Sequence, residues 1–237
     1  GSIPKQMLWF TLPFMASNAL QVLYSTIDMM IVGQYVGTAG LSAVAQSSQI
    51  VNFATMVFLG FANAGQVLIS QALGAGKKDK INNIVGTLTS LLCIIALAFT
   101  VLFIAIKSPV LTVLNVPVES YEMAMDYLVI CSYGLIFTAG YNMVSAVLRG
   151  MGDSSRPLLF IAIATVVNLV LDIIFTGFWG WGVKGAAWAT VIGQAVSFLF
   201  SVWYLYKNKQ TFGFSFKKET FIIDKSYAGM ITKLGTP

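Results

Sequence analysis

The sequence predicts an all-α integral membrane protein with six transmembrane helices. Of its 237 residues, 57% are hydrophobic and 10% are charged, whereas about 25% of the residues of a soluble domain are charged. The apolar residues also fall into six blocks, each near or above the ~20 residues that a helix needs to cross a bilayer. Alternating ~10-residue segments, which are typical of transmembrane strands, are not visible. The six blocks are residues 6–36, 43–73, 81–106, 118–148, 157–179 and 183–206.

The Lys and Arg residues predict how these spans are oriented. If the N-terminus is cytoplasmic, all 14 of them except Lys107 and Lys184 lie in the inner segments. Cytoplasmic loops carry an excess of such residues, so we expect a multi-pass protein of the plasma or inner membrane with both ends inside. The net charge of +5 follows from this topology and from contact with anionic membrane lipid. It gives no reason to expect a nucleic-acid partner.

Several kinds of chemistry are disfavoured by what the chain lacks. The sequence has no histidine, and Cys93 and Cys131 both lie within apolar blocks, so we expect small core residues and no transition-metal site or cofactor. No nucleophile and base pair suited to an enzyme is found in the spans. The two glycine-containing turns 74–78 and 149–153 follow helices rather than strands, which favours helix caps over a dinucleotide fingerprint.

The fifth block carries an unusual pair of polar residues. Asn168 and Asp172 are one helical turn apart and share one face of the predicted helix. An ionised carboxylate in hydrocarbon is penalised by at least ~2.5 kcal/mol, so Asp172 should face protein or water and should be functional.

Counting from the outer ends of the spans places other polar residues at the same depth. Asp28 precedes Val36 by eight residues, and Asp172 precedes Trp179 by seven. Tyr127 and Thr190 lie equally far past the starts of the fourth and sixth spans. At ~1.5 Å per residue, all four lie about 10 to 12 Å below the outer ends.

Each of these residues taken singly could simply join two helices by a hydrogen bond. That reading explains two aspartates at matched depth poorly, because no span supplies a Lys or Arg at that depth to pair with them. Two carboxylates in one partly dry pocket cannot both stay ionised cheaply, so at least one should bind a proton or a metal cation. Exchange of H⁺ or Na⁺ at such a site is typical of a secondary transporter.

Motifs along the whole chain resemble those of the MATE family of multidrug and toxic compound extrusion transporters. The presence of an aspartate in both the first and the fifth span most resembles the DinF-like branch of that family. These motifs are Ile27 to Gly33, Leu41 to Val44, Gln71 to Gly76, Leu148 to Asp153, Asn168 to Asp172 and Gly182 to Thr190. The resemblance implies a secondary active transporter that exports organic cations or drugs in exchange for H⁺ or Na⁺.

The resemblance also implies roles for particular residues. The coupling-ion site would consist of Asp28, Asn168, Asp172 and Thr190. A substrate cavity would adjoin this site. We expect Gln21, two turns deeper than Asp28, and Tyr127 in this cavity. Pro13 removes a backbone hydrogen bond from the first span, and we expect that span to bend there.

The family has twelve spans in two lobes, whereas this sequence predicts six. We therefore expect residues 1–206 to form an amino-terminal lobe, followed by a basic cytoplasmic linker, 207–225, and by the start of a seventh helix, 226–237. The run 233–237 echoes 9–13, where the first span begins. The expected partner is a second transporter lobe, in the same chain or in a separate one.

Two alternatives to drug export remain open. A flippase for lipid-linked precursors, in the same superfamily, would move a pyrophosphate cargo and so would need Lys or Arg in its cavity, whereas the spans supply only acids. An intramembrane enzyme is the more remote alternative. Neither the identity of the substrate nor the choice between H⁺ and Na⁺ follows from the sequence, because the same oxygen ligands serve both ions.

Overall fold

A computed structural model describes residues 3–208 and 222–235; the side chains of residues 3–10, 78 and 79 lie outside the described part. The described chain is helical, with no strand in these ranges, which confirms the all-α fold class. The elements are α1 (Ile3–Tyr35), α2 (Thr38–Gly74), α3 (Lys78–Val113), α4 (Val118–Gly150), α5 (Ser155–Asp172), a π-helix η1 (Ile173–Phe178), α6 (Gly182–Lys207) and α8 (Lys225–Gly235).

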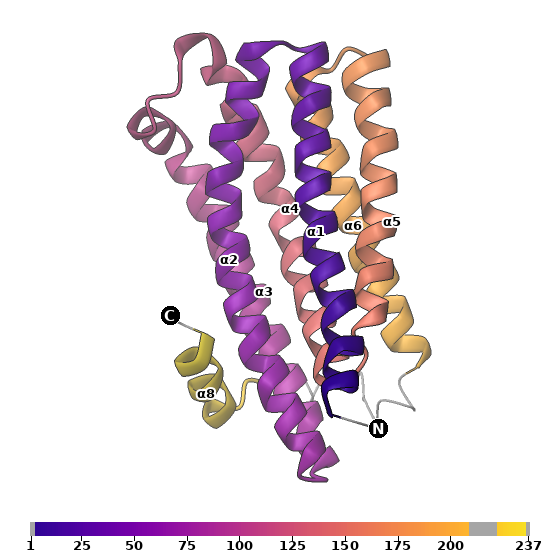
Figure 1. Ribbon diagram of the computed structural model, residues 1–237. Helices are drawn as coiled ribbons and strands as arrows, with labels where there is room; N and C mark the ends of the chain where they lie inside the picture. The colour runs from indigo at the N-terminus through magenta and orange to yellow at the C-terminus, as the bar shows by residue number, and fades with distance from the viewer. Residues whose placement is uncertain (1–2, 209–221, 236–237) are drawn as a thin grey trace.

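The long helices run up and down in one bundle (Figure 1). α4 is its centre and packs against α2, α3 and α6, while α1 contacts mainly α5 and α2. Hydroxyl groups join the helices through backbone carbonyls. Ser47 of α2 donates to the carbonyl oxygen of Ala124 at 2.9 Å, and Ser197 of α6 donates to that of Phe160 at 3.2 Å. Polar side chains therefore stabilise helix contacts here, as is common in membrane bundles.

Five helical segments are long and apolar enough to cross a membrane: Thr38–Gly74, Lys80–Val113, Val118–Gly150, Ser155–Phe178 and Gly182–Lys207. They match the second to sixth predicted spans. α1 forms at the predicted place and has 33 residues, but it is not among these five. Polar residues such as Asn18, Gln21 and Asp28 lower its hydropathy, which suits a helix beside a polar cavity. Six spans therefore stay a prediction, while a multi-pass membrane protein is supported.

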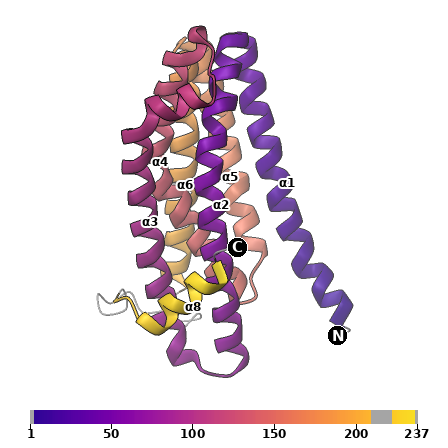
Figure 2. The ribbon, with the colours of Figure 1, turned by 90° about the vertical axis from the view of Figure 1, so that its left-hand side faces the viewer.

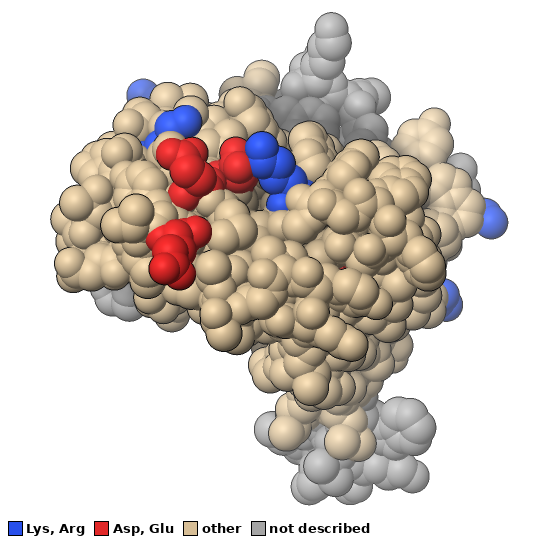
Figure 3. Space-filling view, turned by 90° about the horizontal axis from the view of Figure 1, so that it is seen from above, with Lys and Arg blue, Asp and Glu red and all other residues tan. Residues whose placement is uncertain are grey.

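The two ends of the bundle differ in charge. We call one the basic end: it holds the α2–α3 turn, the α4–α5 turn, the end of α6, and both ends of the described chain (Figures 1 and 2). The opposite, acidic end gathers Asp and Glu side chains beside Lys side chains (Figure 3). Asp126 there forms an ion pair of 3.1 Å with Lys184, and Glu119 and Glu122 are exposed.

The turns at the basic end have the predicted glycine caps. Gly76 and Gly152 have φ values of 70° and 92°, a left-handed conformation that glycine adopts without steric cost. The expected linker 207–225 lies largely outside the described residues. Residues 226–235 of the expected seventh helix lie in α8, which lies across α2 and α3 (Figure 2), and a further span that begins here stays a prediction.

Labelling of a single cysteine tests which end is cytoplasmic. Lys80 is exposed in the first turn of α3, so Lys80→Cys, in a background with Cys93 and Cys131 replaced by alanine, should react with a membrane-impermeant thiol reagent. We expect modification in inside-out vesicles and protection in intact cells. Reaction only from outside the cell would contradict the predicted topology. Val118→Cys, at the exposed start of α4, is the control for the opposite end and should react in intact cells.

Candidate functional site

The two predicted carboxylates meet at the contact between α1 and α5. Asp28 is 5% exposed and Asp172 is 0% exposed, and their carboxyl groups are close enough to interact directly. Neither oxygen of Asp172 makes a hydrogen bond of ordinary geometry with any described residue. The ion pairs among the described residues, Arg156–Asp153 and Lys184–Asp126, involve neither carboxylate. Two buried acids therefore face each other without a cationic partner.

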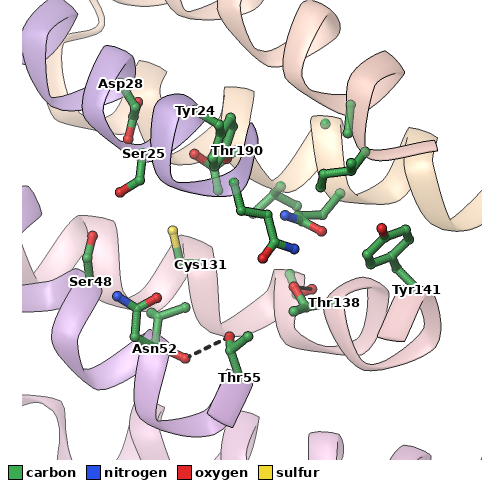
Figure 4. Close-up of a pocket in the computed structure, with 18 of the residues that line it drawn as sticks. Tyr24, Ser25, Asp28, Ser48, Asn52, Thr55, Cys131, Thr138, Tyr141 and Thr190 are labelled. Carbon is green, nitrogen blue, oxygen red and sulfur yellow. Dashed lines mark hydrogen bonds between the residues drawn. The ribbon is translucent and has the colours of Figure 1, made fainter. Parts of the chain in front are cut away.

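The other predicted site residues surround this pair. The amide of Asn168 interacts with Asp172 from one turn away on α5. The hydroxyl of Thr190, on α6, is buried beside that of Tyr24, which in turn lies near both aspartates. Figure 4 shows Tyr24 and Thr190 approaching each other from α1 and α6. The structure thus brings together residues from three helices that the depth count placed in one layer.

A close helix contact positions Asn168. Gly193 of α6 faces it, and a Cβ atom at this position would lie 3.1 Å from the Cβ of Asn168 and 3.2 Å from the carbonyl oxygen of Ala164. Only a residue without a side chain fits this spacing without movement of α5. The approach of α6 to α5 therefore fixes the face of α5 that carries Asn168 and Asp172.

A π-helical turn, η1, begins directly after Asp172. The ring of Phe175, in η1, stacks on the rings of Trp179 and Trp181. In each pair the two ring centroids are 5.1 Å apart. The extra residue per turn redirects the chain beyond Asp172, and π-turns of this kind recur at functional sites. The predicted span 157–179 corresponds to the continuous helical segment Ser155–Phe178, but the π-helical form of its last six residues was not predicted. The cluster of aromatic residues and glycines in 175–182 is the signal that could have indicated an irregular helix end.

A cavity of about 170 Å³ adjoins the carboxylates and is lined by α1, α2, α4, α5 and α6. It runs along the bundle, with Asp28 near one end and Tyr141 at the other (Figure 4). Gln21 and Tyr127 line it, as expected, and so does Thr190. Asp172 and Asn168 are not among the lining residues, because they lie behind the cavity wall. The predicted coupling set is thus divided, with Asp28 facing the cavity and Asp172 buried behind it.

Several polar residues of the cavity escaped the sequence analysis. Tyr24 and Ser25 belong to the same face of α1 as Asp28, so helical periodicity could have found them. The remaining ones lie on α2, for which no depth was counted, or deeper on α4, α5 and α6 than the residues that were counted. They are Ser48, Asn52 and Thr55 of α2, Thr138 and Asn142 of α4, Thr165 of α5 and Gln194 of α6.

The electrostatic character of the cavity follows from its lining. Asp28 is the one ionisable carboxylate among the lining residues, which include no Lys or Arg, and most others are neutral hydroxyls, amides or aromatic rings. Such a surface attracts cations and offers aromatic faces to an organic cation. Asp28, Asp172, Asn168 and Thr190 also carry oxygen atoms, which are the kind of ligand that hard metal cations prefer, and a carboxylate can instead bind a proton.

Pro13 lies inside α1, which continues through it from Ile3 to Tyr35. The Ser17 hydroxyl donates a hydrogen bond of 2.8 Å to the Pro13 carbonyl oxygen. Because proline has no backbone N–H, the turn before it lacks one helical hydrogen bond. A single conformation does not test whether α1 bends there, so bending stays a prediction.

Comparison with known proteins identifies the family. Residues 13–174 match the MatE family. The chain is 35% identical over 209 residues to YpnP of Bacillus subtilis strain 168, described as a probable multidrug resistance protein, covering 88% of this chain and 47% of that protein. The chain thus spans about half the length of this relative.

Solved structures give the same result for the fold. A MOP superfamily transporter from Pyrococcus furiosus, whose binding pocket is described as having reverse polarity, superposes with a TM-score of 0.88 at 25% identity, over 99% of this chain and 52% of that one. A multidrug resistance MATE family transporter in an outward-facing conformation superposes with a TM-score of 0.87 at 25% identity, over the same shares of the two chains. These proteins are transporters and not enzymes, and this chain belongs to the MatE family.

Proposed function

We propose that the chain is the amino-terminal lobe of a secondary active transporter that exports organic cations, including drugs, in exchange for H⁺ or Na⁺. The observation that carries the proposal is the pair of buried carboxylates, Asp28 and Asp172, which interact with each other and have no cationic partner among the residues that the structure describes. Such a pair stays buried at low cost only when a proton or a metal cation neutralises part of its charge.

The division of the pair suggests how coupling works. Asp28 lines the cavity and can meet a cationic substrate, whereas Asp172 lies behind the wall beside Asn168. A cation held between the two carboxylates would neutralise Asp28 as well as Asp172. An organic cation that enters the cavity would compete for the same negative charge. Binding of substrate and binding of the coupling ion would therefore be mutually exclusive, which is the requirement for exchange.

The size of the cavity supports a role as one of two lobes. A volume of about 170 Å³ is smaller than the roughly 300 to 1,000 Å³ of sites that enclose drug-sized ligands. The relatives are about twice as long as this chain. We propose that a second lobe completes the substrate site, in the same polypeptide or as a separate chain, with membrane lipid around both.

A lipid-linked precursor flippase is less well supported. A pyrophosphate cargo calls for Arg or Lys donors, and none is found among the described residues that line the cavity. Reconstitution of the complete transporter that carries this lobe separates the two functions. We expect efflux of a fluorescent organic cation, such as ethidium, driven by an imposed H⁺ or Na⁺ gradient. Transfer of a lipid pyrophosphate without cation efflux would overturn the proposal.

Pro13→Ala should impair transport more than folding. Alanine restores the missing backbone donor and straightens the preferred path of α1, so we expect ion binding at the carboxylates to move this helix less. Efflux per folded molecule should fall several-fold, while the amount of folded protein stays equal or rises because proline disfavours helix interiors. Structures of an active wild-type protein at low and high pH with identical α1 conformations would remove the basis of this prediction.

A further inference from the structure

Arg149 is a buried charged residue that the proposed ion and substrate sites do not use. It belongs to the last turn of α4, at the basic end, and is 8% exposed. Its Nε donates a hydrogen bond of 2.9 Å to Oε1 of Gln66 on α2. Its Nη2 is buried without a hydrogen-bond partner, and no ion pair among the described residues includes it. A guanidinium in this position is costly to bury, so a role beyond packing is expected.

A further contact of Arg149 reaches α1. The centre of its guanidinium lies 5.4 Å from the centroid of the Phe14 ring, within the range of a cation–π interaction. Phe14 follows Pro13, where the helix lacks a backbone hydrogen bond. Arg149 therefore connects three helices: its own backbone is in α4, its Nε binds α2, and its charged face lies against α1.

This contact lies where α1 is otherwise held loosely. Of residues 11–20, only Ser17 is buried, whereas nearer the acidic end both Asp28 and Val32 are buried. Figure 2 shows α1 diverging from the other helices towards its N-terminus. Among the described side chains of residues 11–20, few are buried against other helices, so a single polar contact there can determine the position of this part of α1.

The contact between Arg149 and Phe14 lies between the cavity and the basic end of the bundle. Tyr141 and Asn142 mark the basic-end limit of the cavity on α4. Tyr141, Ser145 and Arg149 follow at intervals of four residues on one face of that helix, and Tyr141 interacts with both of the others. Arg149 thus lies about two turns beyond the cavity, between it and the basic end.

We propose that Arg149 is a positioning residue of the transport cycle, whose guanidinium tethers α1 at Phe14 to α2 and α4 and so limits access to the cavity from the basic end. Separation of Phe14 from Arg149 then lets α1 move at Pro13 and opens a path from the basic end to the cavity. The role in transport rests on the proposed function, but the limit on access itself can be measured without any transport.

Accessibility of a cysteine within the cavity tests this limit on access. Thr138 lines the cavity and is half-buried, so Thr138→Cys, with Cys93 and Cys131 replaced by alanine, is the reporter. The complete transporter is reconstituted, and a charged methanethiosulfonate reagent is added from the side at which Lys80→Cys reacts. Phe14→Leu, which keeps apolar bulk but removes the ring, should raise the labelling rate about 2-fold to 10-fold, as should Arg149→Gln. Phe14→Tyr should keep the original rate.

Arg156 supplies a matched control. Its guanidinium lies 5.0 Å from the ring centroid of Tyr204, a similar contact that joins α5 to α6 and does not involve α1. Arg156→Gln should leave the labelling rate unchanged, and the double variant Phe14→Leu with Arg149→Gln should label no faster than either single variant. If Arg149→Gln fails to fold, the proposal is tested by comparing the labelling rates of the Phe14→Leu and Phe14→Tyr variants. Equal labelling in those two variants, or equal acceleration by Arg156→Gln, would overturn the proposal. An inactive transporter with the predicted labelling pattern would contradict only the proposed function.

Discussion

Asp172→Asn is expected to abolish ion-coupled efflux while leaving a folded protein. Asparagine keeps the size and polarity of aspartate, but it neither releases a proton nor offers a full negative charge to Na⁺. Because Asp172 is fully buried, the variant retains only the Asp28 carboxylate at the site. We expect efflux driven by an H⁺ or Na⁺ gradient to fall by about 100-fold or more, equivalent to roughly 2.7 kcal/mol or more of lost coupling.

Folding should respond in the opposite direction. The neutral side chain removes the penalty for a charge in hydrocarbon, so the variant should insert as well as the wild type or better. A purely structural Asp172 predicts the reverse: less folded protein, with residual efflux in proportion to the protein recovered. Efflux is therefore measured per folded molecule, with Asp126→Asn as the control, since Asp126 is an acid outside the cavity. Near-normal efflux by Asp172→Asn would rule out the assigned role.

Gly193→Leu is expected to have the second large effect, because it separates α6 from α5 at the site. Even the first carbon of a side chain would lie 3.1 Å from the Cβ of Asn168, so leucine does not fit here unless α5 or α6 moves. Overpacking of this kind typically costs about 1 to 3 kcal/mol. We expect a lower melting temperature and, in the protein that still folds, weaker ion binding because Asn168 and Asp172 are displaced.

Gly74→Leu is the matched control for that substitution. A Cβ atom at Gly74, at the end of α2, would meet nothing within 4 Å, so leucine there should leave both the melting temperature and ion binding nearly unchanged. Gly193→Ala should have an intermediate effect, since its methyl group needs a shift of only a few tenths of an ångström. Equal stability of the Gly193 and Gly74 leucine variants would contradict the proposed close approach of α6 and α5.

The fold was predictable from the sequence because hydrophobic blocks of about 20 residues have few alternatives in a membrane. The second to sixth blocks correspond to α2 to α6, and the turns with Gly76 and Gly152 are where they were expected. The helix ends were less predictable. Residues 173–178 are as apolar as the helix before them, and their π-helical form depends on the packing of Phe175 against two tryptophans.

The charged residues of the candidate site were easier to predict from the sequence than its uncharged polar residues. Asp28 and Asp172 stand out because a carboxylate in a span has few acceptable environments. Hydroxyl and amide residues do not stand out, since Ser47 joins helices while the adjacent Ser48 lines the cavity. Arg149 was counted with the basic residues of the inner segments, and only the structure shows that it is buried and contacts Gln66 and Phe14.

The most direct test of the central claim is whether substrate displaces the coupling ion from the carboxylate pair. The complete transporter in weakly buffered detergent solution is mixed with a permanently charged organic cation, such as tetraphenylphosphonium, while released H⁺ is followed with a pH indicator and bound ²²Na⁺ is counted. We predict release of about one H⁺ or one Na⁺ per bound cation by the wild type, and no release by Asp172→Asn. Cation binding without release of either ion by the wild type, or undiminished release by Asp172→Asn, would contradict the proposed coupling.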